Sequence, residues 1–477
     1  MLVHPPGGTG VTAFDYRETA PAAATTDMYA AGAERYGHKI VGVPGTVRGL
    51  ELAHRRFGKL PWKDLVDPAI RLAKDGFALD AGMAGSLNSL VAGSAQFPEL
   101  RRVFGKGGGN ESWSPGDRLV QPDLAKTLRA IAEQGPDAFY RGPVADLIAA
   151  EMKAGGGLIT KTDLAAYHAK ERQPVHGTYR GYDVYAPPPP SSGGVCLVEM
   201  LNTLEPFDLK ARRRDAPETL HLMAEAMRRA YCDRARFLGD PDFTAIPGHL
   251  TTKEYGKQLA ASIDLKHATK SESLAPDLKL AGTESDETTH FSVIDKDGLA
   301  VANTYTLEHS YGSRVVVRGA GFLLNNEMMD FNHRPGVTTR RGAIGTSPNQ
   351  VAPGKRMLSS MTPTILAKDG KAVLVTGSPG SRTIINTVLC IVVNVIDYGM
   401  TAREAVDAPR LHHQWFPDEI RLEQIRDSAG IADKLRSMGH RVSGGRQGDA
   451  HTILVDPKSG RYVGAEDHRI GGGLAGY

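Results

Sequence analysis

The hydrophobic pattern of the chain changes near its middle. In the first half, apolar residues recur every three or four positions over long stretches, and this spacing predicts amphipathic helices in residues 46–76, 122–156 and 216–239. Gly58 and Pro61 interrupt the first of these stretches, so we expect two helices there. In the second half, short runs with alternating apolar and polar positions predict β-strands instead.

The predicted strands come in pairs that are joined by turn residues. Three such pairs are "THFSVIDKDGLAVANTYTL", "TPTILAKDGKAVLVTGS" and "HTILVDPKSGRYVGAED", each with a glycine at the turn. A fourth pair, "MLVHPPGGTGVTAFDYRE", opens the chain and is typical of a hairpin from the middle of a sheet, so we expect a fragment that begins at an internal methionine. Helices mostly first and hairpins mostly later predict an α+β fold, with antiparallel sheets covered by helices.

Two further stretches have a distinctive composition. The most apolar one, residues 383–400, contains Asn386, Asn394 and Asp397 and is too short for an uninterrupted membrane span, so it predicts a buried helix. Residues 266–287 are polar and have no periodicity, which predicts an exposed, mobile linker directly before the second half of the chain.

Composition excludes several classes of protein. The 477 residues include 57 Lys and Arg and 54 Asp and Glu, a net charge of only +3, and no basic stripe is interleaved with aromatic residues. Nucleic-acid binding is therefore not expected. Cys196, Cys232 and Cys390 lie far apart in apolar or helix-like segments, so they are typical of core residues and not of a disulfide framework or a metal site.

Familiar catalytic motifs are incomplete in this sequence. "TGSPG" has Thr376 where a nucleophile elbow needs its first glycine. The adjacent His412 and His413 lack the helical spacing that brings two histidines to one metal, and "GGTG" lacks the strand–loop–helix context of a phosphate site. We therefore expect neither a metal ion nor a cofactor.

Thr288 is the strongest candidate nucleophile. It follows the polar stretch and directly precedes a strand. If the bond after Glu287 were cut, the new α-amino group, with a pKa near ~7.7–8.0, would serve as the base that activates the threonine hydroxyl. The simpler interpretation is that a β-branched residue begins a strand here, and the local residues alone leave both interpretations open.

A set of sequence blocks spans the whole chain in order and resembles the γ-glutamyltranspeptidase family. The blocks are "DYRETAPAAAT", "GVPGTVRG", "GGLITKTDLAAY", "PPPSSGG", "TTHFSVIDKDGLAVANTYTL", "GFLLNNEMMDF", "LSSMTPTI", "VTGSPG", "DAPRLHHQW" and "AGY". The resemblance implies an N-terminal-nucleophile hydrolase with a four-layer αββα sandwich. It also implies autocatalytic cleavage between Glu287 and Thr288 into a large subunit, residues 1–287, and a small subunit, residues 288–477, which together form one fold.

The same resemblance assigns expected substrate-binding roles to individual residues. Arg17 matches the arginine that binds the substrate α-carboxylate, a task for which a planar guanidinium is well suited. Ser359 and Ser360 match hydroxyls that hold the same carboxylate. Glu327 and Asp330 match the positions that receive the substrate α-amino group.

The resemblance also indicates catalytic positions and departures from the family pattern. Thr306 matches a threonine bonded to the nucleophile, and Gly380 with Ser381 matches a glycine pair whose backbone N–H groups form the oxyanion hole. A serine at the second position, Ser381, has fewer allowed backbone conformations than a glycine would have. Glu308 replaces an amide and adds a third carboxylate, so we expect one of the three to be protonated or to point away. Arg341 stands where the pocket lid often has an aromatic residue.

Three functions follow as hypotheses. The leading one is a γ-glutamyltransferase or glutathione hydrolase that passes the γ-glutamyl group from a Thr288 ester to water or to an amino-acid or peptide acceptor. A related acylase that cleaves another amide, such as a β-lactam side chain, is the first alternative, and an unprocessed, non-catalytic homologue is the second. The family resemblance suggests a periplasmic or secreted protein that lacks its N-terminal part here, and no membrane segment is visible.

Overall fold

Two antiparallel sheets form the centre of the molecule. The computed structural model describes residues 1–8, 10–277, 288–426 and 429–477. The first sheet has five strands in the order β5-β2-β1-β9-β8, and the second has six in the order β16-β15-β11-β10-β7-β6. The first sheet consists of β1 (Leu2–His4), β2 (Thr12–Asp15), β5 (Lys170–Arg172), β8 (Thr289–Ile294) and β9 (Ala300–Tyr305). The second consists of β6 (Val175–Tyr179), β7 (Tyr182–Ala186), β10 (Thr364–Lys368), β11 (Lys371–Thr376), β15 (Thr452–Val455) and β16 (Tyr462–Ala465).

All four hairpins predicted from the alternating pattern are present. β1 pairs with β2, β8 with β9, β10 with β11 and β15 with β16, each antiparallel. The alternation places one face of each strand toward the other sheet. Leu2, Ala13 and Ala302 of the first sheet meet Ile365 and Val375 of the second in a buried apolar layer.

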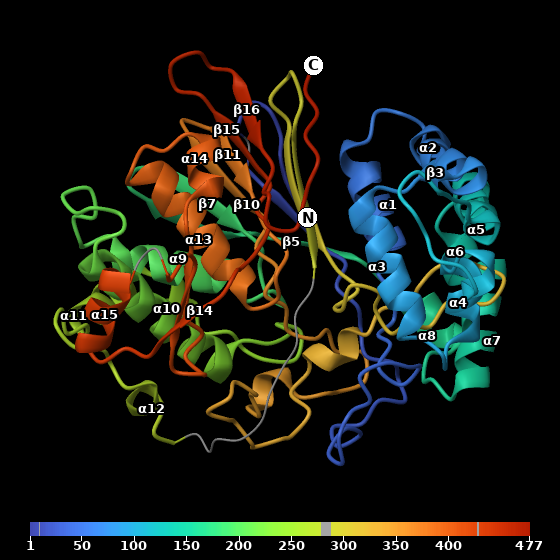
Figure 1. Cartoon of the computed structure of the whole chain (residues 1–477), viewed down its shortest axis with the longest axis horizontal. Helices are drawn as coiled ribbons and strands as arrows, with labels where there is room; N and C mark the ends of the chain where they lie inside the picture. Colours follow the sequence, from blue (N-terminus) through green and yellow to red (C-terminus); the bar gives the residue numbers. More distant parts are fainter. Residues whose placement is uncertain (9, 278–287, 427–428) are drawn as a thin grey trace.

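Helices cover the outer faces of both sheets, which gives four layers. Figure 1 shows α9, α10 and α13 on the outer side of the six-stranded sheet, and Val184 of β7 belongs to the core that these helices share. On the other side, Phe57 of α1 packs with Val3 and Phe14 of the five-stranded sheet. The αββα arrangement expected from the sequence is therefore present. These helices are α1 (Thr46–Phe57), α9 (Gly193–Leu204), α10 (Pro217–Phe237) and α13 (Thr383–Ile396).

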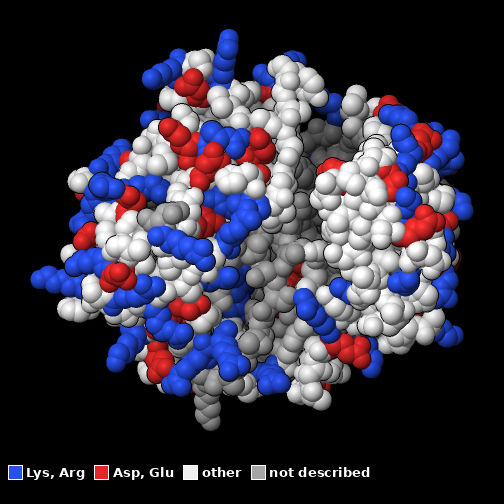
Figure 2. All heavy atoms as spheres, viewed as in Figure 1, with Lys and Arg blue, Asp and Glu red and all other residues white. Residues whose placement is uncertain are grey.

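The helices after α1 form a separate group beside the sheets (Figure 1). Ile131, Ile148 and Val317 lie in one core of this group, and Leu87 and Leu100 lie in another. Figure 2 shows a deep hollow between this group and the rest of the molecule. The group comprises α2 (Trp62–Asp75), α3 (Ala81–Ala92), α4 (Pro98–Phe104), α5 (Pro122–Gln134), α6 (Asp137–Tyr140), α7 (Pro143–Gly155) and α8 (Lys161–Ala166), with the short strands β3 (Phe77–Ala78) and β4 (Arg118–Leu119).

The apolar stretch near residue 390 forms the buried helix α13, as its composition predicts. Asn386 within it donates to the backbone oxygen of His413, 2.9 Å away, so its buried amide nitrogen is paired. Among the described residues, no helix combines the length and the apolar character that crossing a membrane requires. The remaining elements are α11 (Lys253–Ala261), α12 (Ser271–Leu274), α14 (Ala402–Asp407), α15 (Ala429–Ser437) and a small sheet of β12 (Leu411–His412), β13 (Ile420–Leu422) and β14 (Val442–Gly444).

The predicted exposed linker is only partly correct. Ser271 and Ala275 are buried, and α12 lies between them. The Ser271 backbone N–H donates to Asp418 over 2.9 Å, and the Trp415 indole donates to the Ser271 carbonyl over 2.8 Å. The expectation of an exposed stretch is therefore wrong for Ser271 and Ala275, because contacts from distant parts of the chain hold this turn, whereas Lys270, Glu272 and Ser273 are exposed as expected. Residues 278–287 lie outside the described residues.

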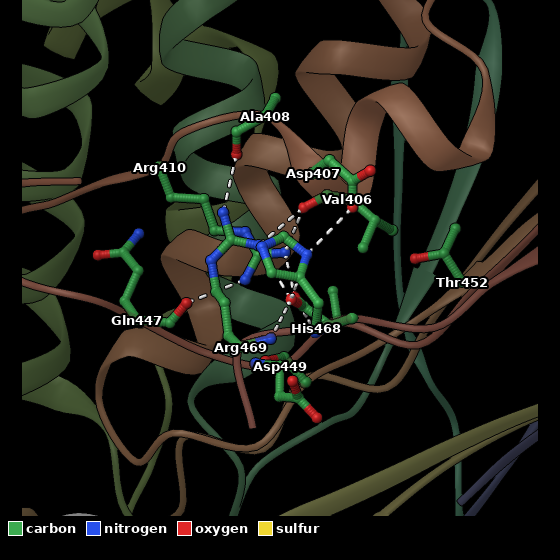
Figure 3. A network of polar contacts seen from close by, with 12 residues as sticks. Val406, Asp407, Ala408, Arg410, Gln447, Asp449, Thr452, His468 and Arg469 are labelled. Atoms are coloured by element: carbon green, nitrogen blue, oxygen red, sulfur yellow. Dashed lines mark hydrogen bonds and ion pairs between the residues drawn. The ribbon is translucent and has the colours of Figure 1, made fainter. Parts of the chain in front are cut away.

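A buried polar network fixes the C-terminal segment to the fold (Figure 3). The Arg410 side chain is fully buried, lies 2.5 Å from Asp467, and donates to the carbonyl oxygens of Val406 and Gln447. Arg469 pairs with Asp467 at 3.0 Å and with Glu423 at 2.6 Å. Because each buried charge has a partner, removal of one side chain leaves its partner uncompensated.

Arg410→Ala is expected to lower the free energy of unfolding by about 3–5 kcal/mol, because Asp467 then keeps a buried charge that has lost its closest partner. The matched control is Arg403→Ala, since Arg403 is exposed and pairs with Asp407 and Glu466 at the surface. That change is expected to cost less than about 1 kcal/mol. Urea unfolding followed by circular dichroism measures both, and equal losses in the two variants would contradict the role given to the network.

Candidate active site

The β8–β9 hairpin brings two threonines to the same place. Thr289 pairs with Tyr305 and His290 with Thr304, so the same register places Thr288 opposite Thr306. The Thr306 hydroxyl oxygen accepts a 2.7 Å hydrogen bond from the backbone N–H of Glu308, which fixes the turn that follows β9. The candidate nucleophile and its expected hydrogen-bonding neighbour thus lie across one strand pair.

Arg17 lies at the end of β2 inside a cluster of carboxyl groups. Its guanidinium is 2.5 Å from Glu327, also contacts Asp330, and is 3.7 Å from Glu18. Its Nε donates to the carbonyl oxygen of Met357 over 3.3 Å. Arg17 is 4% exposed, so it is buried although it follows a hairpin. Its side chain links the end of β2 to the short helix that contains Glu327 and to the loop that contains Met357.

The cluster contains more acid than base. One carboxylate oxygen from each of Glu308, Glu327 and Asp330 lies within 4.8 Å of the other two, and Glu308 and Glu327 are buried. Burial raises the pKa of Glu327 well above its ordinary value, and Arg17 offsets this only in part. Burial would lower the pKa of Arg17, but Glu327 and Asp330 raise it, so the guanidinium stays charged. One guanidinium cannot neutralise Glu18, Glu327 and Asp330 together, and the pKa values of Glu18 and Glu327, both raised by burial, favour the protonated forms of these two groups.

Among the described residues, two groups of side chains have the composition of a cation site, but each already contacts arginine. Arg17 contacts Glu327 and Asp330 in the first group. In the second group, His221, Glu225 and His440, the Glu225 carboxylate lies 3.1 Å from Arg228 and 2.5 Å from Arg229. A guanidinium in direct contact supplies the positive charge that a metal ion would bring.

Ser359 and Ser360 are both buried but have different environments. The Ser359 hydroxyl accepts a 3.0 Å hydrogen bond from the backbone N–H of Met361. The Ser360 hydroxyl accepts a 3.0 Å bond from Arg234 of α10, which also donates to Ser192 over 2.9 Å. Ser359 lines the same cavity as Arg17 and Thr306, so these three residues share one pocket.

The turn between β11 and α13 holds Gly380 and Ser381 in unusual conformations. Gly380 has a φ of 123°, and a Cβ there would lie 2.6 Å from the Thr383 hydroxyl, so only glycine fits. Ser381 has a φ of 49°, the left-handed region that L residues adopt at a cost of about 1–2 kcal/mol. Ser381 therefore adopts a backbone conformation that a glycine would adopt at lower cost. Gly377 of the same turn packs directly against the ring of His290, two residues after Thr288.

Several residues that border the site were not predicted from the sequence. Glu18 is buried beside Arg17, and Tyr16 donates a hydrogen bond to Asn303 of β9. Arg234 belongs to a helix with several buried charged residues, which its amphipathic pattern does not reveal. The signal for Glu18 was its place in "DYRE", next to the residue that the resemblance assigned.

The architecture and the site together define a class of enzyme. Two facing antiparallel sheets between helical layers, with a threonine directly before a strand, are the arrangement of an N-terminal-nucleophile hydrolase. The cephalosporin acylase from Bacillus halodurans has this fold: it superimposes with a TM-score of 0.83 at 25% sequence identity, over 98% of this chain and 84% of that chain. The predicted fold class is thereby confirmed.

Sequence comparison identifies the family within this class. Residues 1–477 match the family model for gamma-glutamyltranspeptidase, so the chain belongs to the γ-glutamyltranspeptidase family and is an enzyme of that family. It is 47% identical over 481 residues to the "Glutathione hydrolase proenzyme" of Escherichia coli K12, covering 98% of this chain and 82% of that protein. It is 36% identical to the "Acylase ACY 1 proenzyme" of Pseudomonas sp. SE83, covering 97% and 83% of the two proteins. The family predicted from the sequence blocks is confirmed.

The buried carboxyl of Glu18 should make stability depend on pH. Burial raises its pKa from 4.5 to about 7, although Arg17 opposes the rise. The folded protein therefore retains a proton that the unfolded chain releases, and this stabilisation, present below pH 4.5, is lost as the pH rises through about 7.

Glu18→Gln should remove this dependence. The free energy of unfolding of the wild type minus that of the variant should fall by roughly 2–3 kcal/mol between pH 4.5 and 7.5 in urea titrations. Glu254→Gln is the control, because Glu254 is exposed on α11. A difference that is the same at both pH values would contradict the assignment.

Proposed function

We propose that this protein is a γ-glutamyltransferase or glutathione hydrolase that cleaves itself before Thr288 and works through a γ-glutamyl ester of that threonine. The observation that carries the proposal is the position of Thr288, at the start of β8 and opposite Thr306, in a fold where a buried arginine–carboxylate cluster adjoins the same hairpin. Family membership supports it, because the similar E. coli protein is named a glutathione hydrolase proenzyme.

Maturation uses the threonine hydroxyl before it uses the amine. The Thr288 Oγ attacks the carbonyl carbon of Glu287, the C–N bond between them breaks, and the hydroxyl proton ends on the new α-amino group. Water then hydrolyses the resulting ester, which restores the hydroxyl and frees the Glu287 carboxylate. Glu287 itself lies outside the described residues. The products are the proposed subunits, residues 1–287 and 288–477.

The charge pattern around Arg17 suits an amino acid in its zwitterionic form. In the proposal, Arg17 binds the α-carboxylate by two parallel hydrogen bonds, and the hydroxyls of Ser359 and Ser360 assist. The excess carboxylates of Glu308, Glu327 and Asp330 receive the α-ammonium. When such a ligand binds, its carboxylate pairs with Arg17, and its ammonium takes the place of Arg17 beside Glu327 and Asp330. Each charge therefore keeps a partner of opposite sign.

Catalysis then proceeds in two half-reactions. The freed Thr288 amine takes the hydroxyl proton while Oγ attacks the γ-carbonyl carbon, and the backbone N–H groups of Gly380 and Ser381 stabilise the oxyanion. The C–N bond breaks, and the leaving amine takes the proton from the Thr288 ammonium. In the second half-reaction, water or an acceptor amine attacks the ester carbon, the bond from that carbon to the Thr288 Oγ breaks, and the proton lost by the nucleophile passes through the Thr288 amine to Oγ, which Thr306 holds.

An acylase for a different amide is the second candidate. It is favoured by the similarity to proteins named acylases and by the departures at Ser381 and Arg341. The carboxyl groups beside Arg17 argue against it, because an acyl group without an α-ammonium would offer Glu327 and Asp330 no cation in exchange for their contacts with Arg17. We therefore retain the γ-glutamyl group as the proposed substrate.

Self-cleavage gives the most direct test of the nucleophile. Expression of the complete protein should yield a small subunit whose first residue is Thr288. Thr288→Ala should remain one chain and should hydrolyse γ-glutamyl anilide at less than about 1% of the wild-type rate, because no hydroxyl can form the ester.

Thr289→Ala is the matched control, since Thr289 is exposed on β8 and retains the neighbouring hydroxyl at Thr288. It should process and remain active. N-terminal sequencing of the small subunit and intact mass decide the matter. A different first residue, or an uncleaved Thr288→Ala with full activity, would refute the mechanism.

A further inference from the structure

Tyr167 joins the helical group beside the sheets to the backbone of Arg17. It directly follows α8 and is 3% exposed. Its hydroxyl donates a 2.9 Å hydrogen bond to the carbonyl oxygen of Arg17. In the described part of the chain, no other group donates to this oxygen. A tyrosine from a distant helix therefore satisfies a buried backbone group of the residue that is expected to bind the substrate carboxylate.

Two neighbours hold the ring of Tyr167 in place. It stacks on Tyr140, with ring centroids 5.8 Å apart and ring planes 12° apart. On Arg356, the guanidinium carbon lies 5.8 Å from the centroid of the Tyr167 ring. Burial raises the pKa of Tyr167 well above its ordinary value, although Arg356 opposes the rise. The phenol therefore keeps its proton at physiological pH and acts as a hydrogen-bond donor.

Arg356 and Asp15 complete a buried frame around the backbone of Arg17. The Arg356 side chain donates to the carbonyl oxygen of His168, the residue after Tyr167, over 2.7 Å. It also lies 3.4 Å from one carboxylate oxygen of Asp15. The other oxygen of Asp15 accepts a 3.1 Å hydrogen bond from the backbone N–H of Arg17. Both backbone polar groups of Arg17 are thus held, one by Asp15 and one by Tyr167.

The direction of the Arg17 side chain follows from these restraints. The side chain leaves the backbone between the two held groups and reaches Glu327 at 2.5 Å. Two parallel hydrogen bonds to a carboxylate need a guanidinium that is held within about 0.5 Å of its proper place. Without the Tyr167 hydroxyl, the Arg17 carbonyl would lose its buried donor. The backbone would then move toward another donor and displace the guanidinium.

We propose that Tyr167 is a positioning residue for recognition of the substrate α-carboxylate: its hydroxyl fixes the backbone of Arg17 and thereby directs the guanidinium toward that carboxylate. The inference rests on the proposed function, because it takes Arg17 as the group that binds the carboxylate. Tyr167 is not among the described residues that line the pocket of Arg17 and Thr306. It therefore acts through Arg17 and does not contact the ligand.

The experiment measures how strongly the processed enzyme distinguishes ligands with and without an α-carboxylate. L-Glutamate and 4-aminobutyrate, which lacks that carboxylate, compete with γ-glutamyl anilide, and the readout is the ratio of their inhibition constants. In the wild type, L-glutamate should bind at least about tenfold more tightly. Tyr167→Phe keeps the ring and removes the hydroxyl. It should lower this preference by about three- to tenfold, and the inhibition constant of 4-aminobutyrate should stay within about twofold of the wild type.

Tyr140→Phe is the matched control. Tyr140 is fully buried, and its hydroxyl donates to the carbonyl oxygen of Pro44 over 2.9 Å. The control therefore loses the same kind of buried hydrogen bond from the neighbouring ring, but it keeps the hydroxyl of Tyr167. Urea unfolding should show a similar loss of stability in the two variants. The ligand preference of Tyr140→Phe should equal that of the wild type.

A second background tests whether Tyr167 acts through Arg17. Arg17→Gln removes the guanidinium, so the preference for L-glutamate should approach one. Addition of Tyr167→Phe to this variant should leave both inhibition constants unchanged, because the hydroxyl then has no guanidinium to position. A residue that only supports the fold would weaken ligand binding in both backgrounds.

Failure of this inference differs from failure of the proposed function. If Tyr167→Phe keeps the wild-type preference, the role of Tyr167 is overturned and the proposed function stays intact. An equal fall in Tyr140→Phe, or a further loss in the Arg17→Gln background, would also overturn that role. If the processed wild type does not hydrolyse the donor, or binds both inhibitors equally well, the proposed function or its use of Arg17 is refuted, and the inference with it.

Discussion

The placement of one buried cation among several carboxyl groups is the constraint on which this site depends. Arg17 contacts Glu327 and Asp330 and lies near Glu18, inside a region that solvent hardly reaches. Such an excess of buried acid persists only where the surrounding fold holds each group in place. Here the restraints come from β2, from the short helix at Glu327–Asp330 and from the loop that contains Met357. This charge pattern is the basis of the proposal that the site binds a ligand with both a carboxylate and an ammonium group.

The two sheets place the reacting groups beside this charge cluster. The β8–β9 pairing sets Thr288 against Thr306. The close packing of Gly377 on His290 holds the turn that contains Gly380 and Ser381 against β8. The same turn begins α13, whose burial anchors it in the main core. Thr306 and Arg17 thus line one pocket, and each is fixed by a different element of the fold.

The sequence predicted the elements whose signals are local. Alternation and turn residues gave the four hairpins, and the spacing of apolar residues gave α1, α2, α10 and α13. It failed for Ser271, which lies in a polar segment without periodicity but is buried and held by Asp418 and Trp415, both distant in sequence. No local pattern marks such contacts.

Within the site, the predictable part and the unpredictable part have different physical origins. Thr288 was recognisable as a residue between a polar stretch and a strand, and the remaining site residues were found through their sequence blocks. Glu18 and Arg234 were missed because their importance comes from burial beside other charges, which only the assembled fold reveals.

The inhibition constants of three small ligands against the processed enzyme test the central claim most directly. L-Glutamate carries both charges, glutarate lacks the α-ammonium, and 4-aminobutyrate lacks the α-carboxylate. If the Arg17 cluster recognises a zwitterion, L-glutamate should bind at least about tenfold more tightly than either analogue, because each loses a charge-assisted hydrogen-bonding group. Glutarate that binds as tightly as L-glutamate would contradict this account, because the buried carboxylates would then have no part in recognition.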